Sequence, residues 1–345
     1  MVTTPFRFCD YINTITCSFK NYFTRFNITL IFLRCKFFLE TPALEGFKKK
    51  RTDSFDSKVM DRFGGRCCMR IGLAQMDISW EDVEKNMVKA ESFFFRGKKQ
   101  KLDILVFPEM TLTGFSMNAN CVGQNWQVQV EFFKRMSREY GIAVVFGYIM
   151  PVPDHELELH PDWNHYHNRL GIAVDGRLRL SYAKIHPFSY GLEAGTYQGG
   201  ERIETMDWQG VGLGALICYD LRFPEVFQIC SASSEVIFVI SNWPAGRVDQ
   251  MDRLLSARAI ENQVYIVGVN RVGQGDGLIY NGHSAVYGPD GSRLTQMTEK
   301  EGLIIGQIDL ELLRRLRREF PMKADRREDL YIRLWEDRLH SPEKK

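Results

Sequence analysis

From Met69 onward, short apolar runs of strand length alternate with helical segments, and this alternation most strongly limits what the chain can fold into. The strand-like runs occupy residues 71–76, 102–107, 142–150, 211–218, 235–242 and 264–270. The helical segments between them include residues 126–140, 223–231 and 248–262. Strands that are apolar along their whole length must be covered on both faces. We therefore expect a layered α/β domain with sheets buried beneath helices.

Two turn signals add antiparallel hairpins to this pattern. GIAVDGRLRLSYA carries a D-G turn at Asp175 and Gly176, and GHSAVYGPDGSRLTQ carries a P-D-G turn at 289–291. A helix is expected around Leu310 to Arg318, on the surface or at a subunit contact.

The first 68 residues differ in composition from the rest of the chain. They are rich in phenylalanine, basic residues outnumber acidic ones, and a KKKR run occupies 48–51. Residues 1–68 are therefore predicted to be a disordered extension, either a transit peptide or a leader upstream of the true start. Residues 69–335 are predicted to form the one folded domain, and residues 336–345 a C-terminal tail.

Charge and cysteine usage narrow the class of partner and the compartment. The 45 basic and 43 acidic residues nearly balance, which argues against a nucleic-acid or membrane-surface partner and favours a small-molecule substrate. Beyond residue 69 only three of the eight cysteines remain, and no C-x-x-C pair occurs. This usage is typical of a reducing compartment. We expect a cytoplasmic protein without a transmembrane helix, or an organellar one if residues 1–68 are a transit peptide.

Three reactive side chains stand where apolar runs stop. Glu109 ends LVFPE, Lys184 ends LSYAK and Cys218 ends LGALIC. Each alone is more often a solvated or a buried structural residue. Together they form a sufficient chemical set, because a thiol needs a base and an adjacent ammonium stabilises both a thiolate and an oxyanion.

The motifs that contain these residues resemble those of the nitrilase superfamily of carbon–nitrogen hydrolases. F-P-E, K-I-H and the unbroken I-C-Y-D-L-R-F-P-E match its Glu-Lys-Cys signature, and the resemblance extends from about Arg70 to Tyr331. FPEMTLTGFSMN and SNWPAGRVDQMDRLLSARAIENQ are similar to the omega-amidase-like branch. The resemblance implies a four-layer α-β-β-α sandwich, a homodimer or higher homo-oligomer, no cofactor and no metal.

The resemblance also implies residue roles. Glu109 would act as the base, Cys218 as the nucleophile, and Lys184 with the backbone N–H of Tyr219 would hold the oxyanion. Many members have a second glutamate that orients the substrate or assists the base. Glu193 is the best match, and Glu201 is an alternative.

Neighbouring residues are predicted to line the pocket or to serve the fold. Asn242 and Trp243 in SNWP are expected to line the pocket, and Arg247 to bind a substrate carboxylate. The other charged residues near the cysteine and on the helix that follows are expected to cap helices or form ion pairs. They are Asp220, Arg222, Glu225, Arg258 and Glu261.

Omega-amides of 2-oxo acids are the favoured substrates, ahead of other aliphatic amides, N-carbamoyl compounds and nitriles. A rival from another class is a metal-dependent hydrolase that uses the histidines of PDHELELHPDWNHYH. Those histidines are His155, His160, His165 and His167. Their spacing is not H-E-x-x-H and Pro161 interrupts any helix, so a solvated loop beside the active site is the preferred interpretation. A catalytically silent scaffold is disfavoured because all three core residues are present.

Overall fold

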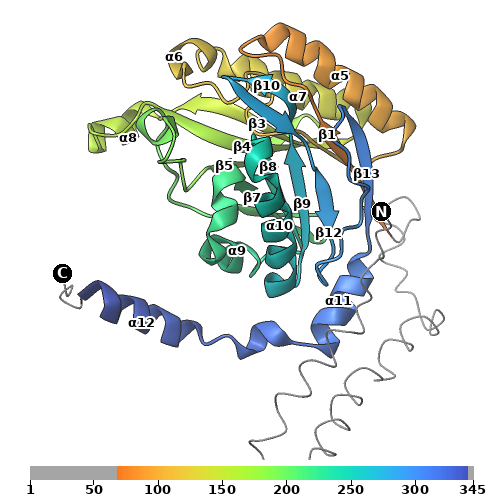
Figure 1. The fold of residues 1–345 in the computed structure, drawn as a ribbon, viewed down its shortest axis with the longest axis vertical. Coiled ribbons are helices and arrows are strands. Elements are labelled where there is room, and N and C mark those ends of the chain that lie inside the picture. The colour runs from red at the N-terminus through yellow and green to blue at the C-terminus, as the bar shows by residue number, and fades with distance from the viewer. Residues whose placement is uncertain (1–67, 341–345) are drawn as a thin grey trace, which may run out of the picture. The chain divides into compact units, whose positions relative to one another are not determined.

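The structure is a computed structural model that describes residues 68–340, in which two facing sheets lie between two layers of helices (Figure 1). The predicted extension at residues 1–68 lies outside the described residues except for Cys68, and residues 341–345 lie outside them as well.

The first sheet has six strands in the order β13-β1-β2-β3-β4-β5. Their bounds are β1 Met69–Gln75, β2 Ile104–Val106, β3 Ala143–Pro151, β4 Tyr166–Val174, β5 Arg177–Ala183 and β13 Gly302–Ile308. Strands β1, β2 and β3 run parallel, and β4, β5 and β13 are added antiparallel. The carboxyl ends of the central strands therefore share one edge.

The second sheet has five strands in the order β12-β9-β8-β7-β6. Their bounds are β6 Thr205–Trp208, β7 Val211–Ile217, β8 Val236–Ser241, β9 Tyr265–Asn270 and β12 Ala285–Tyr287. Strands β7, β8 and β9 run parallel, between antiparallel edge strands. A separate two-stranded ribbon is formed by β10 (Val272–Gly275) and β11 (Leu278–Asn281).

Long helices cover the outer faces of both sheets. Helices α5 (Val83–Lys99) and α7 (Trp126–Tyr140) pack on the first sheet, and α9 (Pro224–Cys230) with α10 (Val248–Asn262) covers the second. The remaining helices are α6 Ala119–Val122, α8 Asp154–Leu159, α11 Leu310–Glu319 and α12 Glu328–His340, with the 3₁₀ turns η1 Glu193–Gly195, η2 Cys218–Arg222, η3 Ala245–Arg247 and η4 Met322–Asp325. Local sequence fixes the ends of both helices on the first sheet. The Asp82 side chain accepts from Lys85 N at 3.0 Å and so caps the start of α5, and Gly141 ends α7 in a left-handed conformation with φ 65°.

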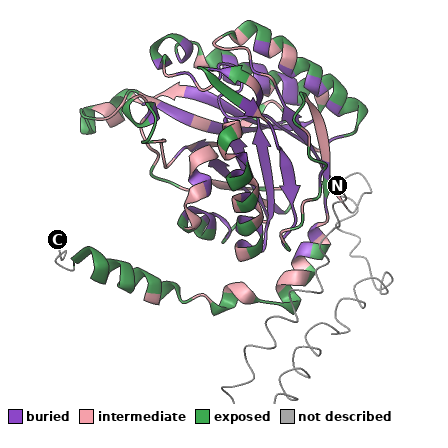
Figure 2. Ribbon diagram, viewed as in Figure 1, coloured by how far each residue is buried: buried purple, intermediate pink, exposed green. Residues whose placement is uncertain are grey.

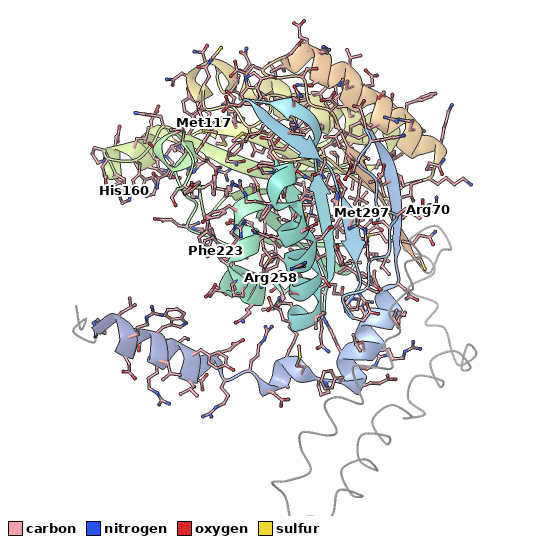
Figure 3. All side chains as sticks on the ribbon, viewed as in Figure 1. Arg70, Met117, His160, Phe223, Arg258 and Met297 are labelled. Atoms are coloured by element: carbon pink, nitrogen blue, oxygen red, sulfur yellow. The ribbon has the colours of Figure 1, made fainter. Side chains whose placement is uncertain are left out.

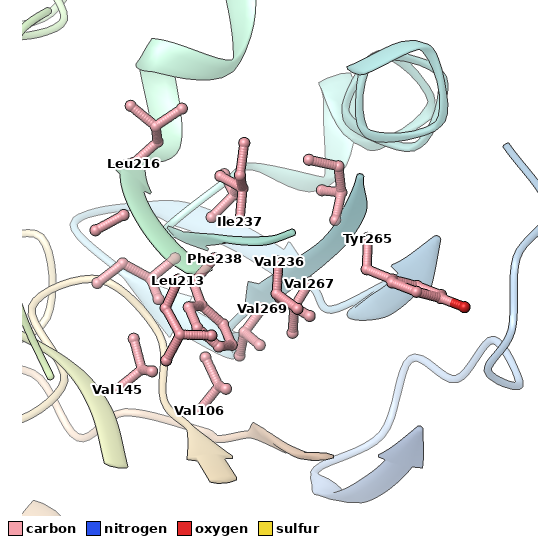
Figure 4. Packing of buried hydrophobic residues seen from close by; sticks show 14 of the residues in the cluster. Val106, Val145, Leu213, Leu216, Val236, Ile237, Phe238, Tyr265, Val267 and Val269 are labelled. Atoms are coloured by element: carbon pink, nitrogen blue, oxygen red, sulfur yellow. The ribbon is translucent and has the colours of Figure 1, made fainter. Parts of the chain in front are cut away.

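The main core lies between the two sheets. Val106 and Val145 of the first sheet meet Leu213, Phe238 and Val269 of the second (Figure 4), and these side chains are fully or almost fully buried. Colouring by burial shows the same central band of strands (Figure 2). With helices on the outer faces, the strands are covered on both sides, which confirms the predicted four-layer α-β-β-α sandwich.

The two predicted hairpins form to different extents. The D-G turn joins β4 to β5, and Asp175 and Gly176 both have positive φ, at 50° and 79°. That hairpin is confirmed. The second hairpin is confirmed as a short pairing: after the turn at 289–291, Tyr287 and Arg293 form an antiparallel bridge and Leu294 N donates to Val286 O at 2.8 Å, before the chain crosses to β13. Arg293 also donates from its guanidinium to the His283 and Ser284 carbonyl groups, and these contacts help to hold the segment.

The C-terminal part of the described chain was only partly predicted. Helix α11 falls where a surface helix was expected, and α12 was not predicted at all. The predicted start of the tail at residue 336 falls inside α12, whose residues are largely exposed (Figure 2). Within residues 68–340, no helix combines the length and apolarity needed to cross a membrane.

Candidate active site

Strand ends place the three reactive side chains. Glu109 follows β2 and Cys218 follows β7, which are both parallel strands, and Lys184 follows β5. The backbone at Glu109 lies so close to β3 that a Cβ on Gly147 would come within 2.8 Å of the Glu109 Cα. A glycine at 147 is therefore required for Glu109 to take this position.

The backbone at Cys218 turns sharply. Its φ is 43°, an uncommon left-handed value for a residue with a side chain, and it begins the 3₁₀ turn η2. Asp220 holds this turn, because its carboxylate accepts from Ile217 N at 3.0 Å and from the Tyr182 hydroxyl at 2.8 Å. His186 also donates its backbone N–H to Asp220 at 3.0 Å. The structural role predicted for Asp220 is confirmed, and its effect is to fix the turn that presents the cysteine.

Lys184 lies fully enclosed between two carboxylates. Its Nζ donates to Glu109 Oε1 at 2.9 Å and to both carboxylate oxygens of Glu193 at 2.8 Å. Burial alone would lower the pKa of Lys184, but the charges of Glu109 and Glu193 outweigh it and raise that pKa. The lysine therefore remains an ammonium while it is buried at 1% exposure.

Both glutamates accept hydrogen bonds from donors on several elements. Glu109 Oε1 accepts from Asn168 Nδ2 at 2.7 Å, and its Oε2 accepts from Asn242 N at 2.8 Å. Glu193 accepts from Asn168 Nδ2 at 2.9 Å and from Phe188 N at 2.6 Å. Burial, with the charge of Glu109, raises the pKa of Glu193, and Lys184 and the hydrogen bond from Asn168 oppose part of that shift.

Of the two candidates for the second glutamate, the structure brings only Glu193 to the site. Glu193 is fully buried and bonded to Lys184, whereas Glu201 is exposed.

Cys218 lines a small pocket with Lys184 and remains partly exposed. Burial, then the negative charges of Glu109 and Glu193, raise the pKa of the thiol well above its ordinary value, while Lys184 acts in the opposite direction. The resting cysteine is therefore a neutral thiol. It needs a neighbouring base to become nucleophilic.

The pocket has a volume of about 60 Å³ and is lined by aromatic and cationic side chains. Besides Lys184 and Cys218, its lining comprises Phe115, Phe188, Tyr219, Arg222, Asn242, Trp243, Pro244, Arg247, Leu278 and Tyr280. All four residues predicted to contact substrate, Tyr219, Asn242, Trp243 and Arg247, lie on this lining.

Two residues differ from their predicted roles. Arg222, expected only to cap or pair, places its guanidinium 4.9 Å from the Trp243 ring centre and donates to Gln250 at 2.9 Å, so it is a pocket residue. Asn242 does more than line the pocket, since its backbone N–H and side-chain amide both donate to Glu109. Arg258, as expected, pairs with Glu261 at 3.0 Å and also donates to the Leu221 carbonyl group.

Sequence reasoning missed Asn168, which donates to both carboxylates. The sequence offers little signal for it, because Asn168 lies between His167 and Arg169 in the YHNRLGIAV run of β4. Tyr280 was also missed, because it reaches the pocket from the β10–β11 ribbon, which carries no motif. Phe115 was missed as well, although it stands in the FPEMTLTGFSMN motif, where it could have been found.

The histidine cluster does not converge. His155 and His160 are exposed on and beside α8, and Figure 3 shows His160 at the outer edge of that segment. His165 is also exposed, whereas His167 is buried with its ring Nδ1 2.8 Å from the Gln198 carbonyl oxygen. Across residues 68–340, no three His, Cys, Asp or Glu side chains are grouped to hold a metal ion.

The chain is similar to known proteins over most of its described residues. Residues 70–318 match the family model "Carbon-nitrogen hydrolase". A 2-oxoglutaramate amidase of Bacillus subtilis is 30% identical over 76% of this chain and 98% of its own length. An omega-amidase of Yersinia enterocolitica is 30% identical over 74% of this chain and 96% of its own length.

A crystal structure of a CN-hydrolase superfamily protein from Xanthomonas campestris aligns with a TM-score of 0.67 and 28% identity. It covers 75% of this chain and 97% of that one. An amidase from Nesterenkonia sp. aligns with a TM-score of 0.66 and 25% identity, over 77% of this chain and 96% of that one.

The four-layer fold and the buried Glu-Lys pair beside a cysteine define an enzyme, and its class is that of the amidases. The chain belongs to the carbon–nitrogen hydrolase family.

Proposed function

We propose that the enzyme cleaves a small linear amide to a carboxylic acid and ammonia through a thioester on Cys218. The observation that carries this proposal is the position of Lys184, an ammonium on the wall of the pocket that contains Cys218 and held at 2.9 Å from Glu109. A neutral thiol, a base and a fixed cation are what acyl transfer to cysteine requires.

In the first half of the reaction, the Cys218 thiol attacks the amide carbon and passes its proton to Glu109. The resulting oxyanion is stabilised by Lys184 and by the backbone N–H of Tyr219. Glu109 then returns the proton to the nitrogen, the carbon–nitrogen bond breaks, and ammonia leaves behind a thioester.

In the second half, Glu109 removes a proton from water, and the hydroxide attacks the thioester. A second tetrahedral intermediate collapses, the carbon–sulfur bond breaks, and the Glu109 proton returns to the sulfur. The net reaction consumes one water and leaves the thiol as it began.

The favoured substrate is the omega-amide of a 2-oxo acid. Two guanidinium groups, those of Arg222 and Arg247, line the pocket, and arginine matches the geometry of a carboxylate. A volume of about 60 Å³ suits a short chain rather than a bulky one. The relatives named for 2-oxoglutaramate and omega-amides support the same choice.

An ammonia-release screen tests this proposal directly. Purified protein is assayed with 2-oxoglutaramate, simple aliphatic amides, N-carbamoyl amines and nitriles, beside Cys218→Ala. We expect 2-oxoglutaramate to give the highest kcat/KM and Cys218→Ala to give no turnover. Activity in Cys218→Ala equal to that of the wild type would refute the mechanism.

Replacement of Arg247 by methionine tests the carboxylate contact. We expect Arg247→Met to lower kcat/KM for the acidic amide by about tenfold to a hundredfold, since a charged hydrogen bond contributes about 1.5–3 kcal/mol. Neutral amides should be hydrolysed as before. Arg253→Met is the matched control, because Arg253 is an exposed arginine of α10, the helix that directly follows Arg247. Unchanged selectivity between acidic and neutral amides in Arg247→Met would refute the proposed contact between Arg247 and the substrate carboxylate.

We also propose that the enzyme is a homodimer or higher homo-oligomer, with α12 at the contact. Tyr331, Leu334 and Trp335 of α12 line a groove of about 650 Å³ together with Pro224 and Gln228 of α9. Exposed apolar patches of this kind mark interaction sites. Light scattering should give a multiple of the 40.0 kDa chain mass, and a monomer at micromolar concentration would contradict the proposal.

The cytoplasm is proposed as the compartment because few cysteines follow residue 69. Cell fractionation with sequencing of the native N-terminus tests this proposal, and recovery in an organelle with residues 1–68 removed would replace it.

A further inference from the structure

We propose that Asn168 is a positioning residue that donates one hydrogen to Glu109 and one to Glu193, so that Lys184 can turn from them toward the oxyanion. This inference rests on the proposed function, because it assigns a residue to the same reaction. Asn168 is not part of the Glu-Lys-Cys motifs, and it does not line the pocket.

The position of Asn168 is fixed from both its backbone and its side chain. It lies in β4, with 1% of its surface exposed, and its backbone carbonyl group accepts from Lys184 N at 2.9 Å. In the register of the sheet it faces Ile149 of β3. The backbone that carries the amide is therefore bonded directly to the backbone that carries the lysine.

The side-chain amide is divided between the two carboxylates. Nδ2 lies 2.7 Å from Glu109 Oε1 and 2.9 Å from Glu193 Oε1. An amide NH₂ has two hydrogens, so each carboxylate receives one and both donors are used. The orientation of the amide is set by chemistry, because two acceptors cannot face a carbonyl oxygen.

Lys184 is also fully hydrogen-bonded by the two carboxylates. Its three N–H groups meet one oxygen of Glu109 and two of Glu193, so the resting lysine has no donor to spare. For an oxyanion to be bound, one of these contacts must be released. The Asn168 donor allows this, since each carboxylate keeps a neutral hydrogen bond when the lysine turns.

The remaining groups that face the two carboxylates do not titrate in the working range. Burial raises the pKa of Tyr280 to about 12, and it raises the pKa of Tyr197 as well. The pKa values of Lys184 and Cys218 are raised, so these groups remain an ammonium and a thiol. Protonation of Glu193, whose pKa is raised by burial, is therefore the titration that we expect to limit activity in acid.

Two replacements separate positioning from space filling. Asn168→Leu removes both donors at similar size, and the side-chain carbonyl oxygen of Asn168 has no hydrogen-bond partner among the described residues, so no protein donor to it is orphaned. Asn168→Asp keeps the shape but places a third carboxyl group beside one ammonium. If the amide positions charge, Asp is the more harmful replacement, and if it only fills space, Asp is the milder one.

The experiment records the pH dependence of kcat/KM and, independently of any substrate, the pH dependence of Cys218 alkylation by iodoacetamide. We expect the acid limb to move upward by about one to two pH units in Asn168→Leu, from the loss of a hydrogen bond to a charged group, and further in Asn168→Asp. Asn262→Leu and Asn262→Asp are matched controls, because Asn262 is also fully buried and bonds to Arg258 O and Arg326 away from the site.

An unchanged acid limb in folded Asn168→Leu, or a smaller shift in Asn168→Asp than in Asn168→Leu, would overturn the assignment. A wild-type enzyme that hydrolyses none of the amides would instead refute the proposed function. In that case the alkylation profiles still decide the role of Asn168.

Discussion

Two regions of the described chain concentrate titratable side chains, and only one of them forms the candidate active site. In the segment 153–167 four histidines stand close together in sequence, yet three are exposed and the fourth is bonded to a backbone carbonyl group. Glu109, Lys184 and Cys218 are far apart in sequence, yet a fully buried cluster joins the first two beside the third. Convergence of strand ends, rather than local density, makes the site.

The contrast is sharpest within one strand. His167 and Asn168 are adjacent in β4, and because strand side chains alternate, His167 bonds to Gln198 while Asn168 bonds to the two carboxylates. The same backbone thus serves a structural contact on one face and the proposed chemistry on the other.

Among replacements in the two regions, Glu109→Gln is expected to lower kcat the most. The amide cannot accept the thiol proton, and its NH₂ group would face the donors of Lys184 and Asn168. We expect kcat to fall by about 10²–10⁴-fold at any pH, which steady-state ammonia release would measure. Wild-type kcat in this variant would mean that another group is the base.

Lys184→Met should follow closely and should also destabilise the fold. It removes the cation between two buried carboxylates, which leaves their charges uncompensated. We expect a loss of about 10²–10³-fold in kcat and of about 3–5 kcal/mol in the free energy of unfolding. Chemical denaturation measures the second quantity, and an unchanged midpoint would contradict the buried charge pair.

A smaller effect is expected for the second glutamate, with a matched control in the chain. Glu193→Gln keeps the shape but weakens the hold on Lys184, so we expect a fall in kcat/KM of about tenfold to a hundredfold. Glu201→Gln changes an exposed residue and should behave as wild type. Equal loss in both variants, or none in either, would break the assignment of Glu193.

The smallest effect is predicted for the histidine segment. His155→Ala, His160→Ala and treatment with a chelator should each leave kcat/KM within about twofold of the untreated wild type. The reason is that these side chains are exposed and belong to no grouped set of ligands in residues 68–340. Loss of activity on chelation, restored by added zinc, would reinstate the metal-dependent alternative.

Much of the fold can be predicted from sequence because its signals are local. The bounds of α7 and α10 match the predicted ranges, since periodic apolar residues and end signals such as Gly141 fix them. The short extent of the pairing after the P-D-G turn and the helix α12 could not be predicted in the same way. The first depends in part on where the Arg293 side chain binds, and the second has an exposed, weakly patterned surface.

Site residues that stand in recognisable motifs could be predicted from the sequence. Those brought to the site only by the arrangement of loops and strands could not. Glu109, Lys184 and Cys218 stand in motifs, but the choice of Glu193 over Glu201 depends on which loop reaches the lysine. Asn168 carries no motif, and its role arises only from cross-strand neighbours.

In the proposed reaction, Cys218 carries the acyl group during turnover. Rapid acid quench of the wild-type enzyme with saturating 2-oxoglutaramate, followed by mass measurement of the peptide that contains Cys218, tests it most directly. We expect this peptide to gain the mass of the acyl group, with no such gain in Cys218→Ala. Turnover without any adduct on the Cys218 peptide, or with the adduct on another residue, would contradict it.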